Sequence, residues 1–215
     1  MLLKGGRLAT TELVRWRGRP AVRKRLRMRF RLPVLSAEVD RWLAHREMRQ
    51  MRRAEGIPGV PRVLARLDRT TFVREYVPGV ALPRAERPDR AFFDALMRIV
   101  VALHARGITH NDLHKEANVI VTPDGSPALL DFQLSLSFSR DSALFRLLAR
   151  FDRYHVLKNR RHRLAGGLTA AEEAFFRETA ALRRLHRTLV KKPVNLLTRR
   201  FFPRALGKLP TDTDP

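Results

Sequence analysis

Three polar residues that could act together lie in the neighbouring segments HNDLHKEANVIV and LLDFQLS: Asp112, Asn118 and Asp131. Asn118 opens a short apolar run and Asp131 ends the next one, so a hairpin would bring the two side chains together. A carboxylate and an amide oxygen suit Mg²⁺, which keeps water and phosphate oxygens as its other ligands. Asp112, in the preceding loop, could accept a proton from an attacking hydroxyl. These residue types indicate phosphoryl transfer, which depends mainly on positioning and charge neutralisation.

Phosphate groups also require a cation from the protein. Lys24 ends the segment AVRK on a predicted strand, in a chain with only seven lysines among its 44 Lys and Arg residues. A flexible point charge on a strand suits phosphate oxygens. A carboxylate from the following helix would hold this lysine, and Glu47 is better placed than Glu38.

The elements that must position these residues begin with strands. The segments ELVRW and PAVRKRLRMRF alternate apolar and polar residues around the turn RGRP, which predicts a hairpin, and Gly5 and Gly6 before them predict a tight turn. Residues 36–54 have helical spacing, with Ser36 as the predicted N-cap and an apolar face of Val39, Leu43, Met48 and Met51. Two further strands follow, and the second runs into a Pro-Gly turn that predicts a linker between two lobes.

The second part of the chain is mostly helical by pattern. The segment from residue 88 has an apolar stripe and ends at Gly107. The short strands NVIV and ALLDF come next, separated by the turn TPDGSP. Thr169 and Glu172 then have the spacing of a capping box before a long helix. The predicted stripe of the first of these helices consists of Phe92, Phe93, Leu96, Ile99, Val100 and Leu103.

The composition narrows the classes of function. The chain has no cysteine, so disulfides, cysteine nucleophiles and cysteine-based zinc sites are excluded. No apolar run approaches 18 residues and the first residues lack a signal-peptide core, so a cytoplasmic location is expected. The formal net charge of +23 favours phosphate-rich partners, nucleic acid or an anionic membrane surface, without naming one of them.

The order of the motifs resembles the protein-kinase-like fold. Lys24 in AVRK, Glu47 in the next helix, then REYVPG, LHARGITHNDLHKEAN and LLDFQ occur in the order of that family over roughly residues 5–135. HNDLH in place of HRDLK is more similar to small bacterial branches: RIO-like kinases, lipopolysaccharide-core sugar kinases and aminoglycoside phosphotransferases. The resemblance implies an α+β, minimal two-lobed fold, with a small antiparallel sheet and one helix in the N-lobe and a mostly helical C-lobe that carries the catalytic hairpin.

The resemblance also implies ATP and Mg²⁺ as cofactors and a role for each matching residue. It assigns the catalytic base to Asp112, metal ligands to Asn118 and Asp131, the phosphate-binding pair to Lys24 and Glu47, adenine-contacting backbone groups to Glu75 and Val77, and a shortened phosphate-covering loop to Gly5 and Gly6. His110 would brace the catalytic loop. The implied boundaries are an N-lobe over residues 1–74, a hinge over 75–79, a C-lobe over 80–190 and a basic tail over 191–215.

Several residues depart from the family pattern. Six positions separate Asp112 from Asn118, one more than usual, so the loop must bulge or the metal ligand must shift. Lys115 would then reach the transferred phosphate, with His114 as the other candidate catalytic side chain. Asn111 replaces the arginine that docks a phosphorylated activation loop, and Gln133 replaces a glycine of the metal motif. The sequence after Gln133 is too short for a full activation segment, so we expect neither regulation by loop phosphorylation nor a peptide-docking platform.

The C-terminal residues 179–211 combine nine Lys or Arg residues with leucine and phenylalanine and contain no acidic residue. An amphipathic basic segment on the inner face of a membrane is one interpretation. A helix that packs on the C-lobe with a solvated basic side is another, and a nucleic-acid stripe is a third that only the charge supports.

The sequence therefore predicts an ATP- and Mg²⁺-dependent phosphotransferase that acts on a hydroxyl acceptor. The acceptor is either a sugar of a lipid-linked glycan, such as lipopolysaccharide core, or a protein Ser/Thr. Two alternatives remain. A catalytically weak, kinase-like nucleotide-binding protein would follow if the extra loop residue and Gln133 spoil the site. A basic nucleic-acid-binding protein would follow from charge alone, because nothing in the sequence resembles a base-reading module.

Overall fold

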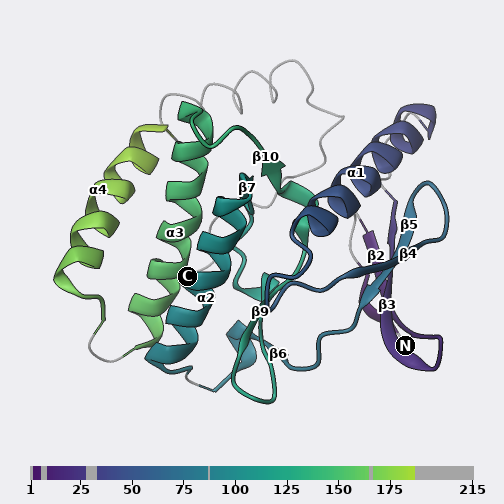
Figure 1. The fold of residues 1–215 in the computed structure, drawn as a ribbon, viewed down its shortest axis with the longest axis horizontal. Coiled ribbons are helices and arrows are strands. Elements are labelled where there is room, and N and C mark those ends of the chain that lie inside the picture. The colour runs from purple at the N-terminus through teal and green to yellow at the C-terminus, as the bar shows by residue number, and fades with distance from the viewer. Residues whose placement is uncertain (1, 6–8, 28–32, 87, 165–166, 187–215) are drawn as a thin grey trace.

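The computed structural model describes residues 2–5, 9–27, 33–86, 88–164 and 167–186. A small sheet with one helix comes first in the chain, and three further helices with short strands follow it (Figure 1). The sheet and its helix lie on one side of the molecule, and the three later helices lie side by side on the other. Among the described helices, none has a stretch apolar and long enough to span a bilayer.

The first sheet has five antiparallel strands in the order β1-β2-β3-β5-β4. Its strands are β1 (Leu2–Gly5), β2 (Ala9–Trp16), β3 (Arg19–Leu26), β4 (Val63–Arg66) and β5 (Thr71–Glu75). The predicted hairpin is confirmed, because β2 pairs with β3 along its whole length. Its two turn residues, Arg17 and Gly18, have φ angles of 49° and 79°, the left-handed values that match the twist of a two-residue hairpin.

Helix α1 (Pro33–Arg53) packs on this sheet, against β3, β4 and β5. The predicted start was wrong: the helix begins three residues earlier than residue 36, so Ser36 lies inside it and is not its N-cap. Proline is favoured in the first turn because it has no N–H that needs a partner there. The buried face also differs from the predicted one, since Val39 and Leu43 are only half-buried. The buried side chains of the helix include polar ones, which apolar spacing does not reveal: Asp40, Ala44, Glu47, Met48, Gln50 and Met51.

The second part is organised around α2 (Arg90–Ala105), α3 (Ala143–Arg163) and α4 (Ala170–His186). The predicted apolar stripe of α2 is confirmed, because all six of its residues are buried. The capping box before α4 is confirmed too: Glu172 Oε2 accepts from Thr169 N at 2.8 Å and Thr169 Oγ1 from Glu172 N at 3.3 Å. The buried Arg160 of α3 ties the helices together through ion pairs with Asp94 of α2, at 3.0 Å, and Glu172, at 2.7 Å.

Short strands and 3-10 turns connect these helices to the sheet. The predicted hairpin is present as β8 (Val119–Val121) and β9 (Pro127–Leu129), and β6 (Val80–Ala81) extends it to three strands. A second small sheet pairs β7 (Ile108–Thr109) with β10 (Leu136–Ser137). The 3-10 turns are η1 (Leu82–Arg84), η2 (Glu116–Asn118) and η3 (Phe132–Leu134).

Residues 76–79 cross from the first sheet to β6. Gly79 ends this crossing with a φ of 134°, and a Cβ atom there would lie within 3 Å of the Val121 carbonyl oxygen. Only glycine combines that backbone angle with such a close approach. A continuous apolar core runs from the first sheet into the helices, through Met48, Met51 and Phe72, then Leu96, Val100, Leu103 and Phe132. The two parts of the chain are therefore held together by shared packing.

Candidate active site

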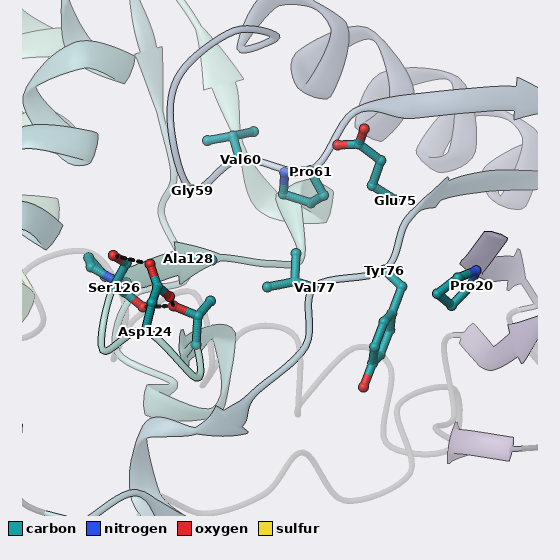
Figure 2. A pocket seen from close by; sticks show the side chains of 12 residues that line it. Pro20, Gly59, Val60, Pro61, Glu75, Tyr76, Val77, Asp124, Ser126 and Ala128 are labelled. Carbon is teal, nitrogen blue, oxygen red and sulfur yellow. Dashed lines mark hydrogen bonds between the residues drawn. The ribbon is translucent and has the colours of Figure 1, made fainter.

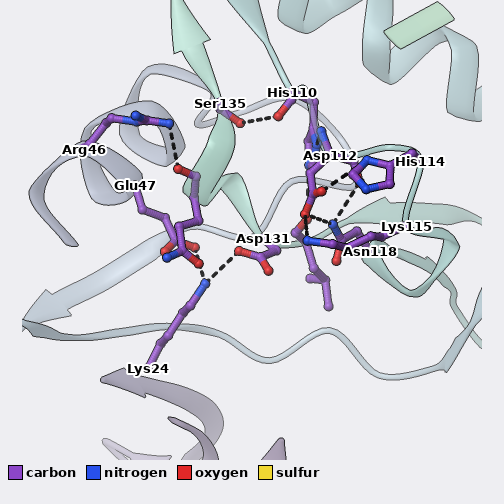
Figure 3. A network of polar contacts seen from close by, with 12 residues as sticks. Lys24, Arg46, Glu47, His110, Asp112, His114, Lys115, Asn118, Asp131 and Ser135 are labelled. Atoms are coloured by element: carbon purple, nitrogen blue, oxygen red, sulfur yellow. Dashed lines mark hydrogen bonds and ion pairs between the residues drawn. The ribbon is translucent and has the colours of Figure 1, made fainter. Parts of the chain in front are cut away.

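A buried ion-pair cluster joins the first sheet, α1 and the end of the hairpin (Figure 3). Lys24 Nζ on β3 donates to Glu47 Oε1 of α1 at 2.7 Å and to Asp131 Oδ1 at 2.9 Å. The side chains of Lys24 and Glu47 are 7% and 2% exposed, and that of Asp131 is 28% exposed. One lysine thus bridges two carboxylates that lie far apart in the sequence. Glu38, the less favoured partner, is exposed and pairs with Arg41 of its own helix.

The cluster shifts the ionisation of its members in opposite directions. Burial disfavours the charge on Lys24, but the attraction of Glu47 and Asp131 outweighs it and raises the pKa of the lysine. Burial raises the pKa of Glu47, and Lys24 only partly offsets this effect. Asp131 is also partly buried, yet the charge of Lys24 and its hydrogen bond keep the pKa of this carboxyl below its usual value. Asp131 is therefore the carboxylate best prepared to meet a cation.

The extra residue between Asp112 and Asn118 is absorbed by the turn η2. Asn118 N donates to the Lys115 carbonyl oxygen at 2.9 Å, which closes the turn. The Asn118 side chain lies against Asp112: its Nδ2 donates to the Asp112 carbonyl oxygen at 3.0 Å and to Asp112 Oδ2 at 2.8 Å. Because the amide nitrogen is engaged there, the amide oxygen of Asn118 remains as an acceptor or ligand. The Asn118 backbone is also held beside the residue before Asp131, since Leu130 N donates to the Asn118 carbonyl oxygen at 2.8 Å.

Asp112 is 2% exposed, and its two carboxylate oxygens differ. Oδ2 accepts from Asn118 and from Lys115 Nζ at 2.9 Å. Oδ1 is buried and accepts no hydrogen bond, and it lies 3.4 Å from His114 Nδ1, within ion-pair distance when that ring is protonated. The side chains of His114 and Lys115 are about half exposed, at 48% and 52%. Asp112 thus presents one unsatisfied oxygen beside two basic groups that reach the surface.

The loop that carries Asp112 is anchored by hydrogen bonds to the carboxylate of Asp152 on α3, a residue that is 1% exposed. Asp152 Oδ2 accepts from His110 N at 2.7 Å, and Oδ1 accepts from Asn111 N at 2.8 Å. His104 Nε2 lies 3.2 Å from the same Oδ2. Asn111 has a φ of 63°, a left-handed value that asparagine tolerates better than most residues. The carboxylate of Asp152 therefore fixes two successive backbone amides at a strained point of the chain.

His110 is fully buried beneath this loop. Its Nε2 lies 3.1 Å from the Leu130 carbonyl oxygen, and Asp112 N lies 3.4 Å from its Nδ1. Burial lowers the pKa of His110, so the neutral ring is favoured. The ring also packs on Phe132. These contacts agree with the bracing position expected for His110 from the sequence.

We expect Asp152→Asn to destabilise the fold and to loosen the loop that carries Asp112. An asparagine can offer an oxygen to only one of the two backbone amides and turns an N–H donor towards the other. Leaving a buried donor without an acceptor costs about 1–3 kcal/mol. The free energy of unfolding, measured with urea, should fall by about this amount. Asp141→Asn is the matched control, because Asp141 is exposed just before α3. Equal stability of the two variants would contradict the prediction.

Helix α1 is also tied to the segment after Asp131. Arg46 Nη2 donates to the Gln133 carbonyl oxygen at 2.8 Å, and the Arg46 guanidinium lies over the Trp42 ring, 4.8 Å from its centroid. At adjacent positions of α1, Glu47 is therefore fixed to Lys24 of β3 and Arg46 to η3. Gln133, the residue that replaces glycine, is itself nearly buried.

The crossing segment carries Glu75 and Val77, whose backbone the resemblance assigns to adenine. The Glu75 carboxylate forms an ion pair with Arg62, and Glu75 N donates to the Arg62 carbonyl oxygen at 2.9 Å. The Glu75 carbonyl oxygen accepts from Arg74 Nη1, also at 2.9 Å. Val77 lies farther along the same segment, between Tyr76 and the Pro-Gly turn (Figure 2).

A cavity of about 400 Å³ lies against this segment (Figure 2). It is lined by the crossing residues, by the segment after α1 and by the tip of the β8–β9 hairpin, including Glu75, Val77, Val60, Asp124 and Ser126. None of the residues of the ion-pair cluster or the Asp112 loop lines it. The cavity and the polar site are therefore lined by different residues.

Two sequence predictions fall partly or wholly outside the described residues. Gly5 ends β1, opposite Thr10 of β2, whereas Gly6 is not among the described residues. Of the basic segment 179–211, only residues up to His186 of α4 are described, and the tail 191–215 is not. Its membrane interpretation therefore stays a prediction.

Sequence reasoning missed Asp152, Arg46 and Arg74. A signal for Asp152 was present: it lies in the buried stripe of α3 at helical spacing from Phe145, Ala149 and Val156, where an acid is out of place. An acidic residue in an apolar stripe predicts a buried hydrogen-bond acceptor. Arg46 and Arg74 gave no such signal, because arginine is common throughout this chain.

No family model matches the sequence, and a search of the curated proteins found no match. Solved structures do match. The crystal structure of the Rio2 kinase from Chaetomium thermophilum aligns with a TM-score of 0.63 and 19% identity, over 80% of this chain and 60% of that chain. The Rio2 kinase-ADP/Mg²⁺-phosphoaspartate complex from the same organism aligns with a TM-score of 0.62 and 18% identity, over 83% and 60% of the two chains. This chain thus spans 60% of the length of either structure. At this level of identity the likeness establishes the fold: the chain has a protein-kinase-like fold, with a small antiparallel sheet and one helix joined to a mostly helical part that carries the hairpin.

Proposed function

We propose that the protein is an ATP- and Mg²⁺-dependent phosphotransferase that transfers the γ-phosphate to an acceptor hydroxyl. In this proposal, residues 1–74 form the lobe that binds the donor phosphates, 75–79 form the hinge, and 80–190 carry the catalytic loop. The observation that carries the proposal is the Asp112 carboxylate, whose Oδ1 is buried without a hydrogen bond while Oδ2 is held by Asn118 and Lys115. An acceptor hydroxyl that donates to Oδ1 would be oriented and deprotonated there.

The cluster around Lys24 supports the donor half of the proposal. Lys24, kept charged by Glu47, would contact the donor phosphates. Asp131 and the amide oxygen of Asn118 would hold Mg²⁺. Among the described residues, no three His, Cys, Asp or Glu side chains gather as a metal site. Two protein ligands suit Mg²⁺, which takes its remaining ligands from water and phosphate. Mg²⁺, when bound, would neutralise charge on the donor phosphates. The similar Rio2 structure is a complex with ADP and Mg²⁺, which supports the same choice of donor and cation.

Two basic side chains lie on the proposed acceptor side of Asp112. Lys115 and His114 flank Asp112 and are about half exposed, so either could meet the transferred phosphate from the side of the acceptor. Lys115 is the better placed, because its Nζ already contacts Asp112 Oδ2 at 2.9 Å. The acceptor is a hydroxyl of a lipid-linked glycan or of a protein Ser/Thr, and the chemistry of Asp112 is the same for both.

Phosphate transfer from labelled ATP tests this proposal. We expect turnover that requires Mg²⁺ and that stops when EDTA removes it, because the single charge of Lys24, already shared by Glu47 and Asp131, cannot also neutralise the donor phosphates. Label should enter either the membrane-lipid fraction or the protein fraction of a cell extract, which identifies the acceptor class. A thermal shift with ATP and Mg²⁺ but no labelled product in either fraction would favour the alternative of a kinase-like nucleotide-binding protein without turnover.

A further inference from the structure

Arg74 lies on the same face of the first sheet as Lys24. In the antiparallel pairing of β3 with β5, Val22 is opposite Arg74 and Lys24 is opposite Phe72. Directly opposed residues of antiparallel strands point to the same face, and so do residues two apart along one strand. The Arg74 side chain therefore enters the space beneath the sheet that also contains Glu47 and Asp131. Arg74 is also the last residue but one of β5, directly before the crossing segment.

The partners of Arg74 are unusual for a buried arginine. Its exposed fraction is 8%, and its Nη1 donates to the neighbouring Glu75 carbonyl oxygen at 2.9 Å. It forms no ion pair with a carboxylate of any described residue, whereas the buried Arg160 forms two. Burial lowers the pKa of Arg74, and the more distant charges of Glu47 and Asp131 oppose this effect. A guanidinium has five donors, so most of the donor capacity of Arg74 is available to a ligand.

If the hinge of the proposed function holds the base of the nucleotide, as the resemblance implies for the backbone groups of Glu75 and Val77, the Glu75 carbonyl is an acceptor for that base. Adenine offers an exocyclic amino group, which is a donor, next to an acceptor nitrogen, whereas guanine offers the acceptors O6 and N7 at the same edge. With Arg74 on the Glu75 carbonyl, an adenine amino group would share that oxygen with the guanidinium, since a carbonyl oxygen can accept two hydrogen bonds. A guanine would instead meet the donors of Arg74, in the pairing that arginine makes most often with bases.

We propose that Arg74 is the base-selecting residue of this site and that it allows guanine nucleotides to serve as donors alongside adenine nucleotides. The inference rests on the proposed function in one respect only, the location of the base at residues 75–77. Arg74 touches the base and not the transferred phosphate. Its replacement therefore changes which nucleotide binds, and leaves the Asp112 loop as it is.

Binding of ADP and GDP with Mg²⁺, followed by calorimetry, tests this proposal, together with kcat/KM for ATP and GTP. We expect the dissociation constants of the wild-type protein for ADP and for GDP to differ by no more than about tenfold. Arg74→Met, which keeps the bulk but removes the donors, should lower the affinity for GDP relative to ADP by about tenfold or more, the loss expected for one good arginine–guanine pair. The GDP affinity of Arg74→Lys, relative to ADP, should lie between those of the wild-type protein and Arg74→Met, because lysine keeps the charge but lacks the paired N–H donors of the guanidinium. Arg23→Met is the matched control: Arg23 lies on β3 with its side chain about half exposed, and its loss should leave the ratio unchanged.

The outcomes separate the two proposals. The role of Arg74 is overturned if the wild-type protein binds ADP more than about 100-fold more tightly than GDP. It is also overturned if Arg74→Met and Arg74→Lys leave the ratio of the two affinities unchanged, even if phosphate transfer from ATP succeeds. An Arg74-dependent ratio without phosphate transfer supports the role of Arg74 and overturns the proposed function. If neither nucleotide binds, both proposals fail.

Discussion

Replacing Asp112 with asparagine is expected to lower the rate of phosphate transfer by about 10²–10⁴-fold, the usual contribution of a positioned general base. An amide cannot take the proton of the acceptor hydroxyl. The fold should tolerate the change, because the asparagine oxygen can replace Oδ2, which accepts from Lys115 and Asn118. Its amide nitrogen then takes the place of Oδ1, which accepts no hydrogen bond and lies 3.4 Å from His114 Nδ1, a ring nitrogen that can accept from an amide when the histidine is neutral.

Two measurements make the Asp112→Asn result specific. Nucleotide affinity should stay within a few fold of the wild-type value, because the proposed role of Asp112 is to take the proton of the acceptor and not to hold the base. Asp89→Asn is the matched control. Asp89 is the exposed N-cap of α2, and asparagine caps as well as aspartate does. A variant at Asp112 that retains wild-type turnover would rule out this residue as the base and would return the question to the loop between residues 112 and 118.

Replacing Lys24 with methionine is expected to cost both stability and turnover. The change leaves Glu47, 2% exposed, and Asp131 without their shared cation. Removing one partner of a buried ion pair typically costs about 3–5 kcal/mol. Urea unfolding should show this loss at neutral pH, and phosphate transfer should become undetectable because the donor phosphates lose their protein cation.

The loss of stability in Lys24→Met should depend on pH in a defined direction. Burial already raises the pKa of Glu47, and without Lys24 that pKa rises further. An acid whose folded pKa exceeds its unfolded value stabilises the fold at low pH and loses that contribution as pH rises through the folded pKa. The variant should therefore be relatively more stable in mildly acidic buffer than at neutral pH. A stability difference from the wild-type protein that does not change with pH would argue against an ionised, buried Glu47.

The double variant Lys24→Met with Glu47→Leu separates stability from chemistry. Replacing a buried pair by apolar side chains of similar size is often neutral or stabilising. We expect the double variant to recover most of the lost stability while phosphate transfer stays absent. Lys158→Met is the control for the lysine, since Lys158 is exposed on α3 and its loss should change the free energy of unfolding by less than about 0.5 kcal/mol. Turnover by the double variant would exclude Lys24 from the donor site.

Much of the fold followed from local patterns. The β2–β3 hairpin, the buried stripe of α2, the capping box at Thr169 and the β8–β9 hairpin all depend on residues close together in the sequence. Turn chemistry and side-chain periodicity are enough to predict such elements. The predicted start of α1 was wrong, because the helix begins at Pro33, where proline is favoured in a first turn. Met48 and Met51 of its predicted buried face are buried, but that face also includes Asp40, Glu47 and Gln50, which pattern reasoning assigns to solvent.

The residue types of the site and their order along the chain, Lys24, Glu47, Asp112, Asn118 and Asp131, can be read from the printed sequence. Their contacts cannot. That Lys24 holds Glu47 and Asp131 together and that Asp152 fixes two loop amides depend on packing between elements far apart in the sequence. The physical reason is that a hydrogen bond between residues separated by 23 to 107 positions is set by strand register, helix rotation and burial, and these come from the assembled core.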